Sequence, residues 1–186
     1  MVKRLIVGLM LLGLNSAFAD SLLHRMEGKW RGYGSRYTAA TGKTLRLEAE
    51  VLSTIKEGRL ISRNKVREFT DSIIEDPSEP KESTKIYWVR PEGTREGIYL
   101  LGYGTGDVGL RPSASGRFDG KVFEVRQNVG GNPPFVVESI TEFFGSDRSV
   151  YVERAWHGDS LLNETRMEYI RDRSMREPDF GAGEWD

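Results

Sequence analysis

Ser160 and His157 are the two residues whose types and spacing could support nucleophilic catalysis. They lie in the segment His157-Gly158-Asp159-Ser160, and a serine nucleophile needs a base such as histidine close by. The same segment contains the Gly and Asp that a tight reversal between two strands requires. A hairpin turn is therefore the first interpretation, and a hydrolase that uses Ser160 and His157 is an alternative.

Metal and thiol chemistry have few candidate residues in this chain. The sequence contains two histidines and no cysteine, which excludes disulfides, thiolate metal sites and cysteine nucleophiles. Two histidines without clustered carboxylates do not supply the ligands of a structural zinc site. We therefore expect no cofactor and no metal.

The charge pattern bears on which partners the protein can have. The formal net charge is −1, with basic and acidic residues interspersed along the chain. A nucleic-acid partner requires a basic stripe, and membrane-surface binding requires a basic amphipathic segment. Neither pattern is present, so we expect a small-molecule partner and no nucleic acid or membrane insertion.

The first nineteen residues are typical of an export signal. Lys3 and Arg4 precede an apolar run of about ten residues, roughly half of what a membrane-spanning helix needs. Ala17-Phe18-Ala19 then offers a small-residue cleavage site. We expect a signal peptide over 1–19, one domain over 20–173, a flexible tail over 174–186, and a periplasmic or secreted protein without a lipid anchor.

The rest of the chain predicts strands separated by turns. In the segment 43–55, apolar residues alternate with charged ones, which places one face in a core and the other in water. A short helix is expected over 21–27. Closing the strands into a barrel removes the exposed sheet edges. The sequence thus predicts an all-β, antiparallel up-and-down barrel of roughly 8–10 strands, with a β-sandwich as the alternative. Further strands are expected over 59–69, 83–90, 96–104, 118–129, 135–144, 149–156 and 163–171.

The tripeptide Gly28-Lys29-Trp30 resembles the start of the first strand in the lipocalin and calycin superfamily. The resemblance implies that Trp30 closes one end of a barrel and stacks on a basic side chain of the last strand, here Arg171. It extends to small exported bacterial proteins of calycin type whose roles are unknown. Some small calycin-like barrels hold haem through one histidine, which makes haem bound by His157 an alternative cofactor.

The strand alternation predicts which side chains point into the barrel. Apolar walls with a few convergent polar groups describe a pocket for a small molecule. Arg36 and Arg154 in such an interior require either internal carboxylates such as Glu68 or a bound anion. An apolar ligand with an acidic head group follows if they are inside, and a packed interior if they lie at a solvated rim. The candidate cavity residues are Arg36, Asn64, Trp88, Gln127, Thr141, Arg154, Trp156 and Tyr169.

Three functions remain open from the sequence. The first is a non-enzymatic, exported barrel that binds a small and mostly apolar ligand. The second is an envelope module with a packed barrel, whose loops around 70–82 and 104–117 engage a protein. The third is the hydrolase that uses Ser160 and His157. The volume of the barrel interior distinguishes the first two.

Overall fold

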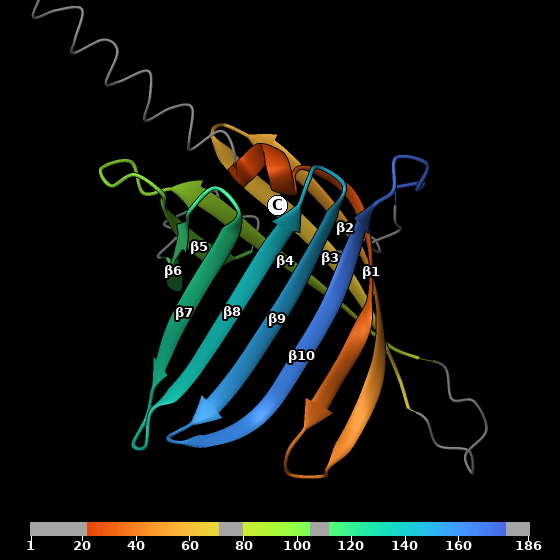
Figure 1. The fold of residues 1–186 in the computed structure, drawn as a ribbon, viewed down its shortest axis with the longest axis vertical. Coiled ribbons are helices and arrows are strands. Elements are labelled where there is room, and N and C mark those ends of the chain that lie inside the picture. The colour runs from red at the N-terminus through yellow and green to blue at the C-terminus, as the bar shows by residue number, and fades with distance from the viewer. Residues whose placement is uncertain (1–21, 71–79, 105–111, 178–186) are drawn as a thin grey trace, which may run out of the picture.

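The protein is a closed antiparallel barrel of ten strands in which neighbours in sequence are neighbours in space (Figure 1). The computed structural model describes residues 22–70, 80–104 and 112–177. A short helix over residues 22–26 precedes the first strand. The predicted up-and-down barrel is confirmed, and the sandwich alternative is wrong. The strands are β1 (Gly28–Thr38), β2 (Lys43–Lys56), β3 (Arg59–Phe69), β4 (Lys81–Pro91), β5 (Ile98–Tyr103), β6 (Ala114–Phe118), β7 (Val122–Gly130), β8 (Phe135–Phe144), β9 (Arg148–His157) and β10 (Ser160–Arg171).

Alternation of apolar and charged residues determines which face of β2 is buried. Leu47, Ala49 and Val51 are buried, while the residues between them lie on the outer face. A two-residue hairpin turn joins β2 to β3. Both turn residues have positive φ, 53° at Glu57 and 72° at Gly58, and this geometry matches the twist of the paired strands.

The segment over 104–117 contains a strand that the sequence did not predict. β6 spans only five residues, and two of its three inward positions hold the small residues Ala114 and Gly116, so its apolar alternation is weak. Close packing requires glycine at position 116, because a Cβ atom there would lie 2.6 Å from the ring of Phe123. The remainder of the expected loops, 71–79 and 105–111, lies outside the described residues, as do the expected signal peptide and residues 178–186.

The start of the expected tail packs on the barrel. Met175 is buried, and Lys29 Nζ donates a hydrogen bond to its carbonyl oxygen at 2.9 Å. Arg31 also forms an ion pair with Asp172 at 2.7 Å. The described part of the tail, residues 174–177, is thus fastened to β1.

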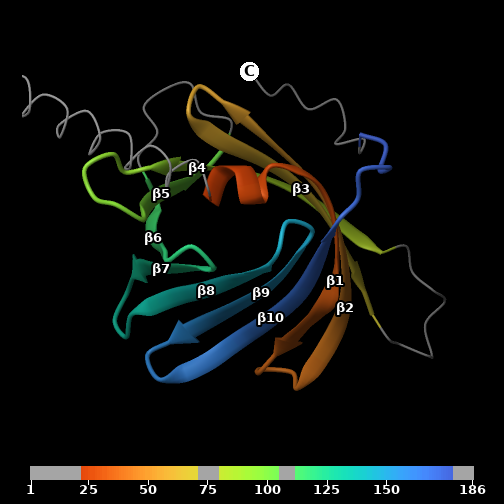
Figure 2. The ribbon, with the colours of Figure 1, turned by 45° about the horizontal axis from the view of Figure 1, so that its top comes forward.

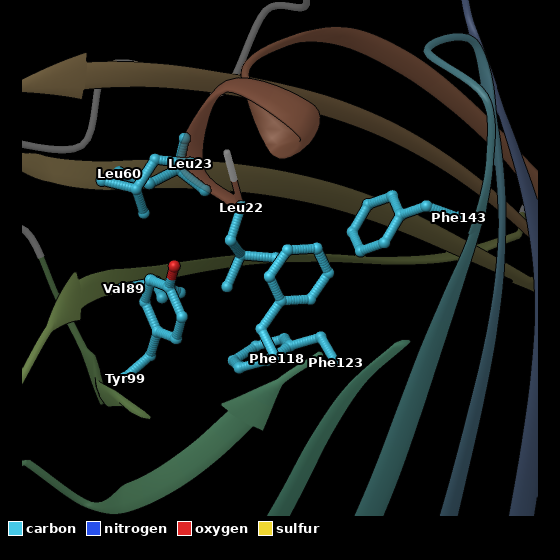
Figure 3. Close-up of a cluster of buried hydrophobic side chains, with 8 residues drawn as sticks. All are labelled: Leu22, Leu23, Leu60, Val89, Tyr99, Phe118, Phe123 and Phe143. Atoms are coloured by element: carbon cyan, nitrogen blue, oxygen red, sulfur yellow. The ribbon is translucent and has the colours of Figure 1, made fainter. Parts of the chain in front are cut away.

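The helix and a cluster of buried side chains fill one end of the barrel (Figures 2 and 3). Leu22 and Leu23 of the helix contribute to this cluster together with residues from strands on both sides. Tyr99, Phe118 and Phe143 form edge-to-face contacts, with Tyr99 to Phe118 centroids 6.5 Å apart and Phe118 to Phe143 centroids 6.0 Å apart. The remaining members are Leu60, Val89 and Phe123.

No helix among residues 22–70, 80–104 and 112–177 is long and apolar enough to cross a membrane.

Candidate ligand-binding site

The barrel encloses a cavity of about 280 Å³ next to the apolar cluster. Its walls combine apolar side chains with hydroxyl, amide and charged groups. Tyr103 and Lys85 line it and are exposed, so the cavity reaches the surface near the middle of β4 and the last residue of β5. Ligand pockets have this composition and are of comparable or larger size. Apolar lining residues include Leu47, Val51, Val89, Phe123, Val125 and Val137.

Five of the eight residues expected in the cavity do line it. They are Arg36, Asn64, Gln127, Thr141 and Tyr169. They come from strands around the whole circumference, namely β1, β3, β7, β8 and β10. Strand alternation alone therefore brings them together, because every second residue of each strand points inward.

Trp88 lies on the outer face of β4, contrary to the sequence-based prediction. Its neighbours Tyr87 and Val89 line the cavity, which places Trp88 on the opposite face. The indole packs over Gly102 of β5, where a Cβ atom would lie 2.5 Å from the ring. Apolar residues occupy both faces of this strand, so alternation of polarity could not identify the inner one.

Arg154 and Trp156 also lie on the outside of the barrel, because the residues of β9 that alternate with them point inward. Tyr151 and Glu153 line the cavity, and Arg154 instead forms an exposed ion pair with Glu164 at 2.6 Å. The cause of the error is that β9 carries its more polar residues inside. A hollow interior tolerates polar groups that a packed core would exclude.

Trp30 and Arg171 meet at the helix end of the barrel. Their residues are partners in the β1–β10 ladder, and the guanidinium carbon lies 4.3 Å from the indole centroid. Arg171 also donates to the carbonyl oxygens of Glu27 and Arg25. Gly28, with φ of 116°, leaves room for this side chain, because a Cβ atom there would lie 2.7 Å from Arg171 Nη1.

His157 and Ser160 face each other across the β9–β10 hairpin. Both side chains are exposed, neither lines the cavity, and they share no hydrogen bond. The described residues contain no group of three or more His, Asp or Glu side chains that could hold a metal ion. The hairpin therefore offers neither an aligned nucleophile and base nor a metal cluster.

Arg36 has an internal carboxylate partner. Its Nη1 lies 2.5 Å from Glu68 Oε1, and its Nε donates to Thr165 Oγ1 at 3.3 Å. The two charged side chains are 28% and 19% exposed, so water screens this pair only partly. The positive charge of Arg36, which the sequence predicted inside the barrel, is thus balanced by Glu68, the carboxylate that the sequence analysis named as its possible partner.

A second polar group in the cavity was missed by sequence reasoning. Tyr151 Oη donates to Glu153 Oε2 at 2.5 Å, and both residues line the cavity. Burial raises the pKa of Tyr151, and the nearby Glu153 carboxylate raises it further. The pKa of Tyr169 is raised by burial, by Tyr87 and by Glu153. The alternation of Ser149, Tyr151 and Glu153 is the signal that could have located this group.

The fold is similar to that of proteins whose structures have been solved. One is the S-type phycobiliprotein lyase CPES from Guillardia theta, with a TM-score of 0.57 and 14% identity over 84% of this chain and 93% of that one. Another is Rv2717c from M. tuberculosis, with a TM-score of 0.54 and 16% identity over 83% of this chain and 98% of that one. No family model matches the sequence, and no curated protein matches it. At these identities the comparison shows a shared barrel fold alone.

Proposed function

We propose that this protein is a non-enzymatic binding protein that carries a small, mostly apolar molecule inside its barrel. The observation that carries the proposal is the cavity of about 280 Å³ beside a fully packed barrel end. A barrel that served only as a scaffold would gain stability from larger apolar side chains in this space, because each buried CH₂ group contributes about 0.8 kcal/mol. The cavity also separates this function from the packed-barrel interaction module.

The lining suggests how the ligand is oriented. Its apolar part packs toward the helix end, against Val89, Phe123 and Phe143. Its polar end lies among the hydroxyl and carboxylate groups of β9 and β10. An acidic head group, which the sequence suggested, would have to bind at Arg36, whose charge Glu68 already balances.

The structural neighbours support the binding function only in that they share the barrel fold. One of them is named as a phycobiliprotein lyase. The likeness is consistent with a barrel that holds a small molecule, and its low identity supports no particular ligand for this chain.

A pair of neighbouring substitutions tests the proposal. Ser139 lines the cavity and Ile140, the next residue of β8, is exposed on the outer face. Ser139→Phe fills the cavity and should weaken binding of an apolar fluorescent probe at least about tenfold, whereas Ile140→Phe should leave it unchanged. Equal binding by both variants would contradict a ligand inside the barrel. Native mass spectrometry of the protein from its own host should also show an added small-molecule mass.

We further propose that the protein acts outside the cytoplasm. The basic start, short apolar run and Ala17-Phe18-Ala19 site support a cleaved signal. N-terminal sequencing of the protein recovered from the periplasm or medium should begin at Asp20. A chain that retains Met1 and stays in the cytoplasm would contradict export.

A further inference from the structure

We propose that the ligand carries a protonated nitrogen and that Glu153 is its main partner inside the barrel. This inference rests on the proposed binding function and specifies the head group of the ligand. It reverses the charge that the sequence suggested, since the sequence pointed to two internal arginines. The charged and polar groups of the cavity differ in whether they already have partners, and this difference indicates the head group.

The cations of the cavity do not require an anionic ligand. Arg36 is paired with Glu68 and also donates to Thr165. Arg154 lies outside the barrel and pairs with Glu164. Lys85 lines the cavity only where its side chain is exposed, so water solvates its charge.

Glu153 is different, because it forms no ion pair with any of the described residues. Its hydrogen-bond partner there is the Tyr151 hydroxyl at 2.5 Å. Thr165 separates Glu153 from Arg36 in the sheet, being the ladder partner of both. A half-buried carboxylate binds a cation more strongly than an exposed one, since fewer waters screen the interaction.

The tyrosines around Glu153 supply no positive charge. Tyr151 and Tyr169 come from β9 and β10, and Tyr87 comes from β4, which is opposite β9 in the ring of ten strands. Burial raises the pKa of all three, Tyr87 and Tyr169 further raise the pKa of Tyr151, and Tyr87 further raises that of Tyr169. The phenols therefore stay neutral at pH 7 and supply no counter-charge to the Glu153 carboxyl group.

Asn64 provides a second and independent indication. It lines the cavity, where its amide also interacts with the Tyr87 hydroxyl, and its Oδ1 atom is buried without a hydrogen-bond partner among the described residues. An amide oxygen can only accept a hydrogen bond, and leaving one buried and unsatisfied costs about 1–3 kcal/mol. A ligand with N–H groups would satisfy this oxygen, whereas a carboxylate ligand would not. The Glu153 carboxyl group and Asn64 Oδ1 thus both favour a ligand that donates hydrogen bonds.

Three probes of equal chain length test the charge of the head group. We would measure binding of octylamine, octanol and octanoate to the full mature chain at pH 7 by calorimetry. Octylamine is protonated and octanoate ionised at this pH. We expect octylamine to bind at least about tenfold more tightly than octanoate, with octanol between them.

Glu153→Gln removes the charge with almost no change of shape. It should weaken octylamine binding at least about tenfold and leave octanol binding within about threefold. Glu138→Gln is the matched control, since Glu138 lies on the outer face of the neighbouring β8 and pairs with Arg126. Circular dichroism and thermal unfolding of each variant report whether the barrel is intact.

The outcomes separate this inference from the function on which it rests. Tighter binding of octanoate than of octylamine, or unchanged octylamine binding by Glu153→Gln, would overturn the inference while leaving the binding function in place. If none of the three probes bound and apolar probes also failed, both would be wrong. Loss of octylamine binding by Glu138→Gln as well would show a general charge effect and would equally overturn the role of Glu153.

Discussion

Arg171→Ala is the substitution that most directly tests how the barrel is closed. The guanidinium lies over the indole of Trp30 and donates to three carbonyl oxygens, those of Glu27, Arg25 and Ser146. The side chain is only 17% exposed. Removing it opens the junction between the helix, β10 and the β8–β9 turn in one step.

The magnitude follows from these contacts. A hydrogen bond to a charged donor contributes about 1.5–3 kcal/mol, and the cation–π contact about 0.5–2 kcal/mol. The freed carbonyl oxygens lie near the surface and regain water, so the sum is an upper limit. We expect a loss of roughly 3 kcal/mol, which corresponds to about 6–12 °C in Tm for a chain of this size. Arg171→Lys keeps the charge but not the planar fork, and should recover about a third of that loss.

Urea denaturation of the wild type and variants measures this loss. Arg173→Ala is the control, because Arg173 is 83% exposed and its ion pair with Asp147 spans 3.6 Å. An exposed pair of this kind contributes at most about 1 kcal/mol. A loss below about 1 kcal/mol for Arg171→Ala, or an equal loss for both variants, would refute the assigned role of Arg171.

Two further perturbations have signs that the structure determines. Glu68→Gln leaves Arg36 without its partner and should lower the free energy of unfolding in urea by about 1–2 kcal/mol, less than for a fully buried pair because both side chains are partly exposed. Replacing both residues with Met should restore most of this free energy. If the double variant instead lost the sum of the two single losses, the pairing would be contradicted. The pKa values of Tyr151 and Tyr169 are raised in the folded state, so the folded protein holds these protons more tightly than the unfolded chain. The resulting stabilisation is complete below about pH 10 and is lost as the pH rises above that value. The free energy of unfolding should therefore fall above about pH 10, and it should fall less steeply in Tyr169→Phe. A free energy of unfolding that stayed constant up to about pH 11 would contradict the raised pKa values.

The order of the strands and several of their ends were predictable, because local residues determine them, although β7 begins at Val122 and β10 at Ser160 where the sequence predicted 118 and 163. Turn residues such as Gly58 and Gly145 sit where the chain reverses, and β3 and β8 span the ranges that the sequence predicts. β6 was missed because small residues at two of its three inward positions conceal the period of a strand. Its pairing with β5 and β7 makes it a strand, and pairing partners distant in sequence cannot be inferred from the segment alone.

The cavity residues were predictable only where polarity and inward direction agree. They agree in β1, β3, β7, β8 and β10, where Arg36 and Tyr169 are found as expected. They disagree in β4 and β9, where the inward face of β9 carries Glu153 and the outer face carries valines. In a hollow barrel the interior contacts a cavity instead of other side chains, so apolar character does not identify the inner face.

The sequence by itself predicted an antiparallel up-and-down meander of roughly 8–10 strands, a helix before it and a Gly-x-Trp start opposite a final arginine, because local alternation, turn chemistry and a short motif indicate them. Only the tertiary structure decided that Arg36 meets Glu68 and that Arg154 faces outward. It also decided that Glu153 faces inward with no counter-ion in the part of the chain that the structure describes. The physical reason is that charge balance in an interior depends on which strands close around it. Closure of the barrel brings together residues that are far apart in the sequence, and a local sequence pattern cannot predict which of them become neighbours.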